Sequence, residues 1–326
     1  MLVCNSANPA IDRRLRLEQI AVGEINRASS VQPFPGGKAA HVAMVAKTLG
    51  LEVMWVGFLG GAAGEQCEAG LSAFGVPLTV IRTHSETRAN LELVSADGTV
   101  TEILEPGGAV SENEVERLLT TCRDLFAESE RGTQVALSGS LPPGVPADLY
   151  AELIRLAQLY GCRTLLDTSG DPLRHGLHAA PDFVKPNRNE ASAFANYPIE
   201  NADNAAKATR QFFAAGAKSV AISLGAEGII WQPTPASDAF VSEPAPIPDC
   251  SPVGCGDAAL AGFAVAFERG LSDEETLRLA TACGAANCLA EAPGRVDHDE
   301  VSRVAQQIQV RRIGCESSRS ATVEAQ

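Results

Sequence analysis

The chain has 326 residues, of which 45% are hydrophobic, and its mean hydropathy is +0.01. This length and composition are typical of a globular protein with one large domain or two smaller ones. A net charge of -14 and an isoelectric point near 4.9 argue against binding to nucleic-acid phosphates or anionic lipids. The apolar stretches, such as 258–267, are shorter than the roughly 20 residues that span a bilayer. We therefore expect a protein that binds neither nucleic acid nor membrane.

Nine cysteines lie along the chain, and no two of them form a Cys-x-x-Cys pair. The odd number and the lack of matching histidine or cysteine partners favour reduced, mostly buried thiols over disulfides or a zinc site. Residues 1–10 contain no basic segment and no long apolar segment, so they are not typical of a signal peptide. Both observations predict a cytoplasmic protein.

Short apolar runs alternate with longer amphipathic stretches along most of the chain, which is typical of βαβ units. The helices that we expect span 39–49, 64–74 and about 111–126, and the expected strands span 53–56, 135–137, 164–166, 183–184 and 220–222. Ser111 and Glu114 have the spacing of a capping box at the start of the third helix. The strands are compact apolar runs, which predicts a mostly parallel sheet with helices on both faces.

Two segments, roughly 12–32 and 89–104, depart from this alternation. In the second, Asp97-Gly98 lies between two alternating runs, as expected of a hairpin turn. If the two segments meet, they form a small antiparallel layer over one edge of the core, in the place of a lid; the alternative is two ordinary surface hairpins. The proline-rich segment 233–248 predicts an irregular or edge-strand connection, and the polar tail 311–326 is expected to be disordered.

A glycine-rich turn, Gly254-Cys255-Gly256-Asp257, runs directly into the apolar stretch 258–267. Such a turn can direct several backbone N–H groups at one point in front of a helix dipole, which is a site for an anion such as a transferring phosphoryl group. Asp257 is either a helix cap or a general base that takes a proton from an attacking hydroxyl. The chain lacks the Gly-x-x-x-x-Gly-Lys-Ser/Thr pattern of a P-loop.

Gly36-Gly37-Lys38 again places glycines before an expected helix, now with a cation. The chain has only five lysines, and Lys38 and Lys185 both lie in turn-like segments instead of on helix faces. Local cations in an acidic protein indicate an anionic substrate. The two glycines alone are more typical of a tight turn.

Lys185-Pro186-Asn187 is followed by Glu190, so that a strand ends in a proline turn. The amide of Asn187 and the carboxylate of Glu190 are three residues apart and face the same side of a helical turn. Hard oxygen ligands in this arrangement can hold the water shell of Mg2+, and they can equally cap a helix.

Together these segments, with others along the chain, resemble the pfkB, or ribokinase-like, family of sugar kinases from about residue 4 to residue 296. Within it they are similar to the branch of 1-phosphofructokinases and tagatose-6-phosphate kinases. The segments that carry the resemblance are Asn8-Pro9-Ala10-Ile11-Asp12, Gly36-Gly37-Lys38, Phe58-Leu59-Gly60-Gly61, Thr87-Arg88-Ala89-Asn90, Ser138-Gly139-Ser140-Leu141-Pro142, Asp167-Thr168-Ser169-Gly170, Lys185-Pro186-Asn187 to Glu190, Ser223-Leu224-Gly225 to Gly228, and Pro252-Val253-Gly254-Cys255-Gly256-Asp257.

The fold that this resemblance implies is an α/β, three-layer α/β/α sandwich with a mostly parallel central sheet and a small β-sheet lid. The kinase domain would span 1–310, with lid segments at about 12–35 and 88–106, and 311–326 as the tail. In the family the lid often serves for dimerisation, so the resemblance also implies a homodimer through the lid.

The activity that the resemblance implies is ATP- and Mg2+-dependent phosphorylation of a sugar phosphate, first of all fructose 1-phosphate to fructose 1,6-bisphosphate. Tagatose 6-phosphate or another sugar is the alternative substrate. Asp257 matches the catalytic base, and the amides of Gly254, Cys255 and Gly256 match the anion hole. Glu190 matches the residue that organises Mg2+ through water, together with Asn187.

The remaining site residues are also carried over from the family. Those that match sugar-phosphate contacts are Asp12, Gly36, Gly37, Lys38, His41, Arg88, Asn90 and Ser138, with Lys38 and Arg88 as the clamp on the phosphate already present. Those that match positions around the nucleotide are Lys185, Asn187, Ser223, Gly225, Gly228 and Asn287.

Two departures from the family pattern lie close to the expected site. The family usually continues Gly-x-Asn-Val after the Gly-Gly-Lys motif, whereas this chain has Ala39-Ala40-His41-Val42. The size of His41 and its titration near neutral pH therefore bear on substrate identity. The last motif begins with Ser251 instead of Asn or Asp and has Cys255 between its glycines instead of Ala or Ser. Cys255 is either a packed thiol or an oxidation-sensitive one.

Two other functions are less consistent with the sequence than the kinase. A sugar-phosphate sensor without catalysis is disfavoured because Asp257, Glu190 and Lys38 are all present. A nicotinamide-dependent dehydrogenase is disfavoured because Gly-x-Gly-x-x-Gly does not follow the first expected strand.

Overall fold

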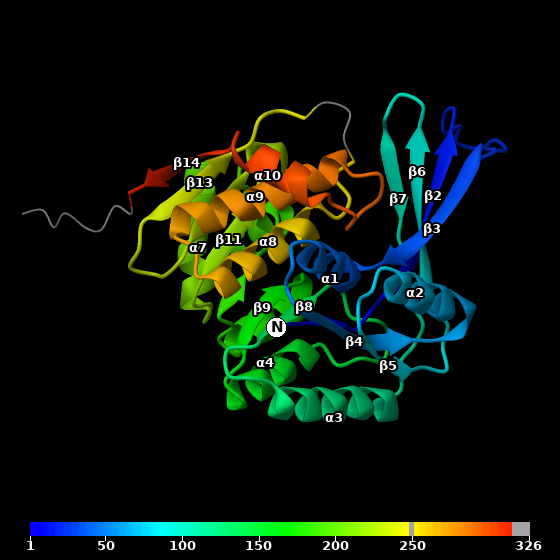
Figure 1. Ribbon diagram of the computed structural model, residues 1–326, viewed down its shortest axis with the longest axis horizontal. Helices are drawn as coiled ribbons and strands as arrows, with labels where there is room; N and C mark the ends of the chain where they lie inside the picture. The colour runs from blue at the N-terminus through cyan, green and yellow to red at the C-terminus, as the bar shows by residue number, and fades with distance from the viewer. Residues whose placement is uncertain (248–250, 315–326) are drawn as a thin grey trace, which may run out of the picture.

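A ten-stranded sheet forms the centre of the computed structural model, which describes residues 1–247 and 251–314 (Figure 1). Its strand order is β14-β13-β12-β11-β10-β9-β8-β1-β4-β5. The strands are β1 (Leu2–Ser6), β4 (Val53–Leu59), β5 (Leu78–Arg82), β8 (Gln134–Ser138), β9 (Arg163–Asp167), β10 (Phe183–Val184), β11 (Val220–Ser223), β12 (Ile229–Gln232), β13 (Ala239–Glu243) and β14 (Gln309–Ile313). The seven strands from β11 to β5 are parallel, and β12, β13 and β14 extend the sheet in antiparallel fashion. The predicted mostly parallel sheet and its predicted strands are confirmed.

Helices cover both faces of this sheet. On one face lie α1 (Lys38–Thr48), α2 (Gly61–Ala73), α8 (Cys255–Arg269), α9 (Asp273–Leu289) and α10 (His298–Ala305); on the other lie α3 (Glu112–Glu128), α4 (Leu149–Leu159), α5 (Gly170–His178), α6 (Arg188–Ala195) and α7 (Ala202–Ala214). The predicted capping box of Ser111 and Glu114 opens α3. The two apolar faces of the sheet thus bury two separate clusters of side chains, which hold the strand ends in fixed positions.

A second, four-stranded sheet stands beside the main sheet (Figure 1) and has the order β3-β2-β6-β7. Its strands are β2 (Ala10–Leu17), β3 (Ser30–Gly36), β6 (Arg88–Ser95) and β7 (Val100–Ile103). The two expected excursions do meet, and Asp97-Gly98 lies in the turn between β6 and β7. The expectation of an antiparallel layer is wrong at its centre, because β2 and β6 pair in parallel.

The end of the chain differs from the prediction in two places. The proline-rich segment contains β13, which is an interior strand and not an edge, because β14 pairs with its outer side. Residues 311–313, expected in a disordered tail, belong to β14, and residues 315–326 lie outside the described part. The edge strand β14 therefore extends the folded domain beyond the predicted boundary at residue 310.

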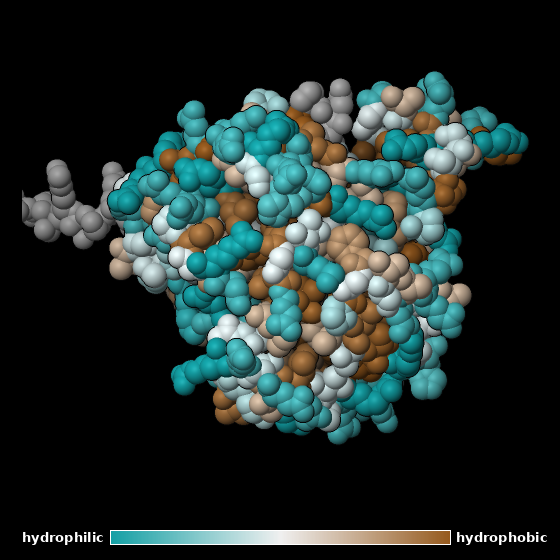
Figure 2. All heavy atoms as spheres, in the orientation of Figure 1, coloured by the Kyte–Doolittle hydropathy of each residue, from teal (hydrophilic) through white to brown (hydrophobic). Residues whose placement is uncertain are grey.

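The surface is mainly polar on the face shown in Figure 2, with apolar patches between the polar side chains. None of the helices within the described residues is both long and apolar enough to cross a membrane.

Candidate active site

The carboxyl ends of the central parallel strands meet the small sheet, and most of the predicted site residues lie there. β1 lies between β8 and β4 in the sheet. The chain adds β4 and β5 on one side of β1 and later adds β8 and β9 on the opposite side. Ligands of open α/β sheets bind at such a switch point. Because β2 of the small sheet follows β1 after three residues, it brings Asp12 to the same place.

The predicted anion hole lies at the start of α8. Gly254 has a φ of 76°, which favours glycine, and a Cβ there would lie 2.9 Å from Cβ of Pro293. Among the described residues, no side chain caps this helix, so the interpretation of Asp257 as a cap is wrong. The N–H groups of the first turn therefore face the site, where they can hold an anion.

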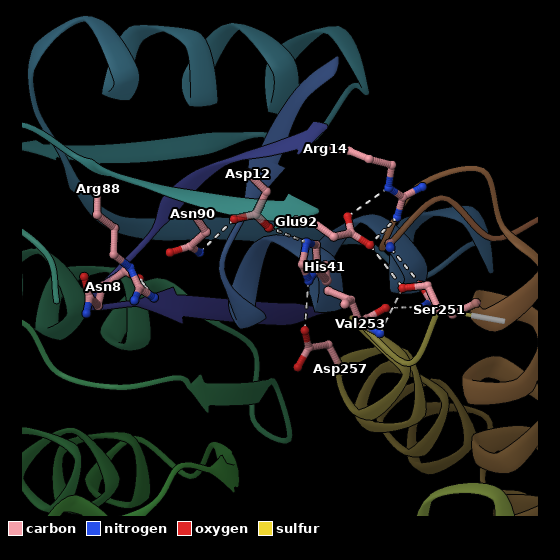
Figure 3. A network of polar contacts seen from close by, with 12 residues as sticks. Asn8, Asp12, Arg14, His41, Arg88, Asn90, Glu92, Ser251, Val253 and Asp257 are labelled. Carbon is pink, nitrogen blue, oxygen red and sulfur yellow. Dashed lines mark hydrogen bonds and ion pairs between the residues drawn. The ribbon is translucent and has the colours of Figure 1, made fainter. Parts of the chain in front are cut away.

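Asp12, His41 and Asp257 form a line of charges between the small sheet and α8 (Figure 3). Nδ1 of His41 lies 2.9 Å from Oδ2 of Asp257, and Nε2 of His41 lies 3.6 Å from Oδ2 of Asp12. All three side chains are buried. His41 thus joins a residue of the expected substrate site to the expected base.

The imidazole of His41 is protonated on both nitrogens in this position, so it is an imidazolium cation. Burial favours its neutral form, but the nearby carboxylate of Asp12 and the hydrogen-bonded carboxylate of Asp257 outweigh burial and raise the pKa of His41 to about 10. The expectation of a group that titrates near neutral pH is therefore wrong, because the two carboxylates on either side stabilise the imidazolium.

Asp12 is fixed by the small sheet around it. Nδ2 of Asn90, its register partner on β6, donates a hydrogen bond of 2.8 Å to Oδ1 of Asp12. A Cβ on Gly36 would lie 2.1 Å from Cγ of Asp12, so the carboxylate occupies space that only glycine leaves open. Gly37 precedes α1 with a φ of 87°. The predicted residues Asp12, Gly36, Gly37 and Asn90 therefore come together.

A second charged cluster surrounds Asp167 at the end of β9. Nζ of Lys38 lies 2.7 Å from its Oδ1, and Nζ of the buried Lys185 lies 2.8 Å from its Oδ2. Burial would raise the pKa of Asp167, but Lys185 and Lys38 hold it below its ordinary value. A Cβ on Gly256 would lie 3.4 Å from Nζ of Lys185, so this ammonium group lies beside the anion-hole turn.

Asn187 and Glu190 cap α6, as one of the two interpretations expected. The side chain of Asn187 accepts from the N–H of Glu190 at 2.9 Å, and Oε2 of Glu190 accepts from the N–H of Asn187 at 2.8 Å. The other oxygen, Oε1, lies 3.9 Å from Nζ of Lys38. Burial, opposed by Lys38, raises the pKa of Glu190. The capping box therefore orients one carboxylate oxygen toward the second cluster.

Arg88 lies at the start of β6. It donates to the backbone carbonyls of Glu105 at 2.8 Å and Asn8 at 3.0 Å, and burial lowers its pKa. The two members of the expected phosphate clamp thus have different partners in this structure. Ser138 is buried at the end of β8.

The residues expected near the nucleotide lie along β10 and β11, with one exception. Asn187 bridges to Ser223, which brings the Lys185-Pro186-Asn187 turn beside Gly225. A Cβ on Gly228 would lie 2.0 Å from the carbonyl oxygen of Ser242, so this position requires glycine for packing.

Asn287 instead braces the anion-hole turn. Its Nδ2 donates to the carbonyl of Val253 at 2.8 Å, and its Oδ1 accepts from the N–H of Gly294 at 2.8 Å. Both ends of this buried amide have protein partners, so its place in the structure is that of a support for the Gly254 turn.

A contact between the small sheet and the segment before α8 was not predicted (Figure 3). Arg14 and Glu92 form a buried ion pair of 2.7 Å, and Arg14 also donates to the carbonyl of Glu291. Oγ of Ser251 donates to Oε1 of Glu92 at 3.1 Å. The opposite charges of Arg14 and Glu92 are visible in the sequence, but they indicate an ion pair only once β2 and β6 are known to pair in this register. The ion pairs of Asp167 with two lysines were also not predicted, although Asp167 directly follows the predicted strand 164–166 and begins the Asp167-Thr168-Ser169-Gly170 motif.

Comparisons with known proteins identify relatives that match most of this chain. The pattern of the pfkB family carbohydrate kinases matches residues 2–298. The tagatose-6-phosphate kinase of Staphylococcus epidermidis is 32% identical, over 95% of this chain and 99% of its own. The 1-phosphofructokinase of Haemophilus influenzae is 34% identical, over 87% of this chain and 90% of its own.

The solved structures give the same assignment. Phosphofructokinase-2 from Escherichia coli in complex with fructose-6-phosphate aligns with a TM-score of 0.84 at 28% identity, over 94% of this chain and 98% of its own. The expected ribokinase-like fold with a small second sheet is thereby confirmed, as is the resemblance carried by the motifs. The chain therefore belongs to the pfkB family of carbohydrate kinases and is an ATP-dependent phosphotransferase.

Proposed function

We propose that this kinase transfers the γ-phosphoryl group of ATP to the free primary hydroxyl of fructose 1-phosphate and forms fructose 1,6-bisphosphate. The observation that carries the proposal is the position of the Asp257 carboxylate within the first turn of α8, beside N–H groups that can hold an anion. A base next to an anion hole is the arrangement that a hydroxyl needs to attack a phosphoryl group. Relatives named 1-phosphofructokinase support this substrate.

The proton of the attacking hydroxyl goes to Asp257. Oδ2 of Asp257 is held by His41 at 2.9 Å, which leaves Oδ1 to receive the proton. Because His41 is already protonated, it orients the carboxylate and does not itself accept the proton. Asp12 holds other hydroxyls of the sugar, with Asn90 fixing its carboxylate.

The amides of the Gly254–Asp257 turn hold the transferring phosphoryl group, and Lys185 and Lys38 supply positive charge beside it. Asp167 lies between the two ammonium groups and fixes them. Nucleotide phosphates then extend past Glu190 toward Ser223 and Gly225.

The residues present fit a Mg2+ ion that is bound mainly through water. Mg2+ takes one or two protein carboxylates together with nucleotide phosphates and keeps several waters. The capping box uses Oε2 of Glu190 and leaves Oε1 directed into the site. When bound there, the ion would neutralise charge on the β- and γ-phosphates.

Arg88 is the residue that we assign to the phosphate already on the sugar. Its guanidinium lies at the start of β6, two residues before Asn90, and burial lowers its pKa, so an anion is a favourable partner. The small sheet would close over the sugar through the contact between Arg14, Glu92 and Ser251 and exclude water from the reaction.

The test is a coupled assay of ADP release with Mg-ATP and five acceptors: fructose 1-phosphate, tagatose 6-phosphate, fructose 6-phosphate, fructose and ribose. We expect turnover with fructose 1-phosphate at a kcat/KM well above the others. His41→Asn restores the amide usual in the family, and a change in the order of substrates would show that His41 selects among them. Preference of the wild type for tagatose 6-phosphate would replace the proposed substrate, and binding without turnover would favour the sensor.

We also propose a homodimer through the small sheet. Five large apolar side chains in or next to this sheet are more than half exposed: Val31 and Ile103 on its strands, Val22 and Ile25 in the β2–β3 loop, and Leu104 directly after β7. Exposed apolar groups gathered in one region are typical of an interface. Light scattering should give twice the chain mass of 34.1 kDa, and Val31→Asp should give the monomer; a wild-type monomer would contradict the proposal.

For the location, we propose the cytoplasm. Cys4, Cys67, Cys122, Cys162 and Cys283 are buried thiols and not disulfides. Thiols of this kind persist in reducing compartments. Thiol titration of the denatured protein, purified without reductant, should find all nine cysteines reduced, and a stable disulfide among the five would count against this location.

A further inference from the structure

Two cysteine thiols meet between the N-terminus of α8 and the C-terminal end of α9. The Sγ atoms of Cys255 and Cys288 lie 3.2 Å apart, and both residues are partly exposed. Gly284, one turn before Cys288, lets the helices approach, because a Cβ there would lie 3.1 Å from the carbonyl oxygen of Cys255. The packing of the two helices therefore sets the distance between the two sulfur atoms.

The surroundings of this pair differ from those of the buried cysteines. Burial raises the pKa of Cys67, Cys122 and Cys283 to about 12 each, which keeps these thiols protonated and unreactive. Cys255, in contrast, is the first residue of a helix, and Nδ2 of Asn287 donates to its sulfur at 3.5 Å. A helix N-terminus and an N–H donor both stabilise negative charge on sulfur.

We propose that Cys255 and Cys288 are a reversible oxidation site, at which a peroxide converts the two thiols to a disulfide. The thiolate of Cys255 attacks one oxygen of hydrogen peroxide, the O–O bond breaks, and a sulfenic acid and one water result. The thiolate of Cys288 then attacks this sulfur, the S–S bond forms, the S–O bond breaks, and a second water leaves. Two thiols are oxidised, one peroxide is reduced, and the two thiol protons end in the waters.

The disulfide would act on the anion hole through the backbone of Cys255. The sulfur atoms of a disulfide lie about 2 Å apart. The present distance of 3.2 Å between the two Sγ atoms must therefore shorten by about 1 Å. Cys255 lies within the Gly254–Asp257 turn, and Cys288 follows Asn287, which braces the same turn. This effect rests on the function proposed above for the turn, whereas the oxidation itself does not.

The experiment treats the full chain with hydrogen peroxide, digests it without reductant and maps the cross-linked peptides by mass spectrometry. We expect a peptide pair joined through Cys255 and Cys288, a fall in kinase activity of about 10²-fold, and recovery of activity with dithiothreitol. Cys288→Ser should keep its basal activity, form no cross-link, and retain Cys255 as a sulfenic acid that dimedone traps.

Cys250→Ser is the matched control, because Cys250 precedes Cys255 by five residues and lies outside the described part of the chain. The cross-link should survive this substitution. A bond from Cys255 to Cys250, or oxidised wild-type protein in which Cys288 stays reduced, would overturn the proposal. If the cross-link forms in a protein that phosphorylates no sugar, the oxidation site stands and the proposed function fails.

Discussion

Two charge clusters lie at the carboxyl ends of the parallel strands, and their compositions are opposite. Around His41 one cation lies between the carboxylates of Asp12 and Asp257, whereas at Asp167 one carboxylate lies between Lys38 and Lys185. The first therefore offers carboxylate oxygens to hydroxyl groups, and the second offers ammonium groups to phosphate oxygens. Under the proposed function, this difference assigns sugar recognition to the first cluster and phosphate recognition to the second.

The two clusters are connected through α1. Lys38 and His41 are three residues apart on this helix and so project from neighbouring positions. Burial would lower the pKa of Lys38, but Asp167, Glu190 and Asp257 raise it above its usual value. The start of this helix thus contributes one cation to each of the two clusters.

The largest effect on stability is expected from Asp167→Asn, which removes the centre of the second cluster. The variant leaves the buried Lys185 without its carboxylate, and loss of one partner from a buried pair costs about 3–5 kcal/mol. Guanidinium unfolding of wild type and variant measures this loss. Lys38→Met is the control and should lower the free energy of unfolding by less, because the side chain of Lys38 is 34% exposed. If Asp167→Asn is as stable as the wild type, the ion pairs of Asp167 do not stabilise the fold.

Gly36→Ala should disturb the first cluster alone. A Cβ there would lie 2.1 Å from Cγ of Asp12 and would displace its carboxylate. Displacement of a positioning group by about 1 Å costs about 10²-fold in kcat/KM. Steady-state kinetics with the sugar phosphate varied would detect it. Gly314→Ala, which has open space around it, should behave as wild type, and an unaffected Gly36→Ala would remove Asp12 from the sugar site.

The sequence predicted the fold and the local position of single residues better than it predicted contacts between distant residues. The strands ending at Ser138, Asp167 and Ser223 are compact apolar runs, so their positions along the chain follow from the local pattern. The motifs likewise placed Asp257 and Lys38 at helix starts, where the structure has them.

Contacts between distant segments could not be predicted in this way. His41 is 216 residues from Asp257, and Arg14 is 78 residues from Glu92, so no local pattern relates them. The parallel pairing of β2 with β6 was missed for the same reason, since hairpin signals specify only neighbouring strands. The charge state of His41 depends on both of its carboxylate partners and was therefore predicted wrongly.

The pH dependence of stability should separate the two clusters further. The pKa of His41 is raised from 6.5 to about 10 in the folded state, so its stabilising contribution is fully present below pH 6.5 and is lost as the pH rises toward 10. The difference in free energy of unfolding between wild type and His41→Asn should therefore shrink over this range, because titrations common to both proteins cancel. Chemical denaturation at several pH values measures it, and a difference that stays constant would show that His41 is neutral.

The smallest effect is expected from Ser251→Ala, at the contact between the small sheet and the segment before α8. The hydrogen bond of 3.1 Å to Glu92 is lost, while the ion pair of Glu92 with Arg14 remains. Loss of about 1 kcal/mol should raise KM by about fivefold. Ser302→Ala, which removes an exposed hydrogen bond to the carbonyl of His298, should leave KM unchanged; a similar KM for both variants would argue against closure through this contact.

The measurement that tests the central claim most directly is the rate of phosphoryl transfer to fructose 1-phosphate by Asp257→Asn, with binding of the sugar phosphate followed by thermal shift. The variant keeps the shape of the carboxylate but cannot take the proton, so kcat should fall by about 10²–10⁴-fold while sugar-phosphate binding remains. Turnover near the wild-type rate would contradict the account, because the proton of the hydroxyl would then have another acceptor.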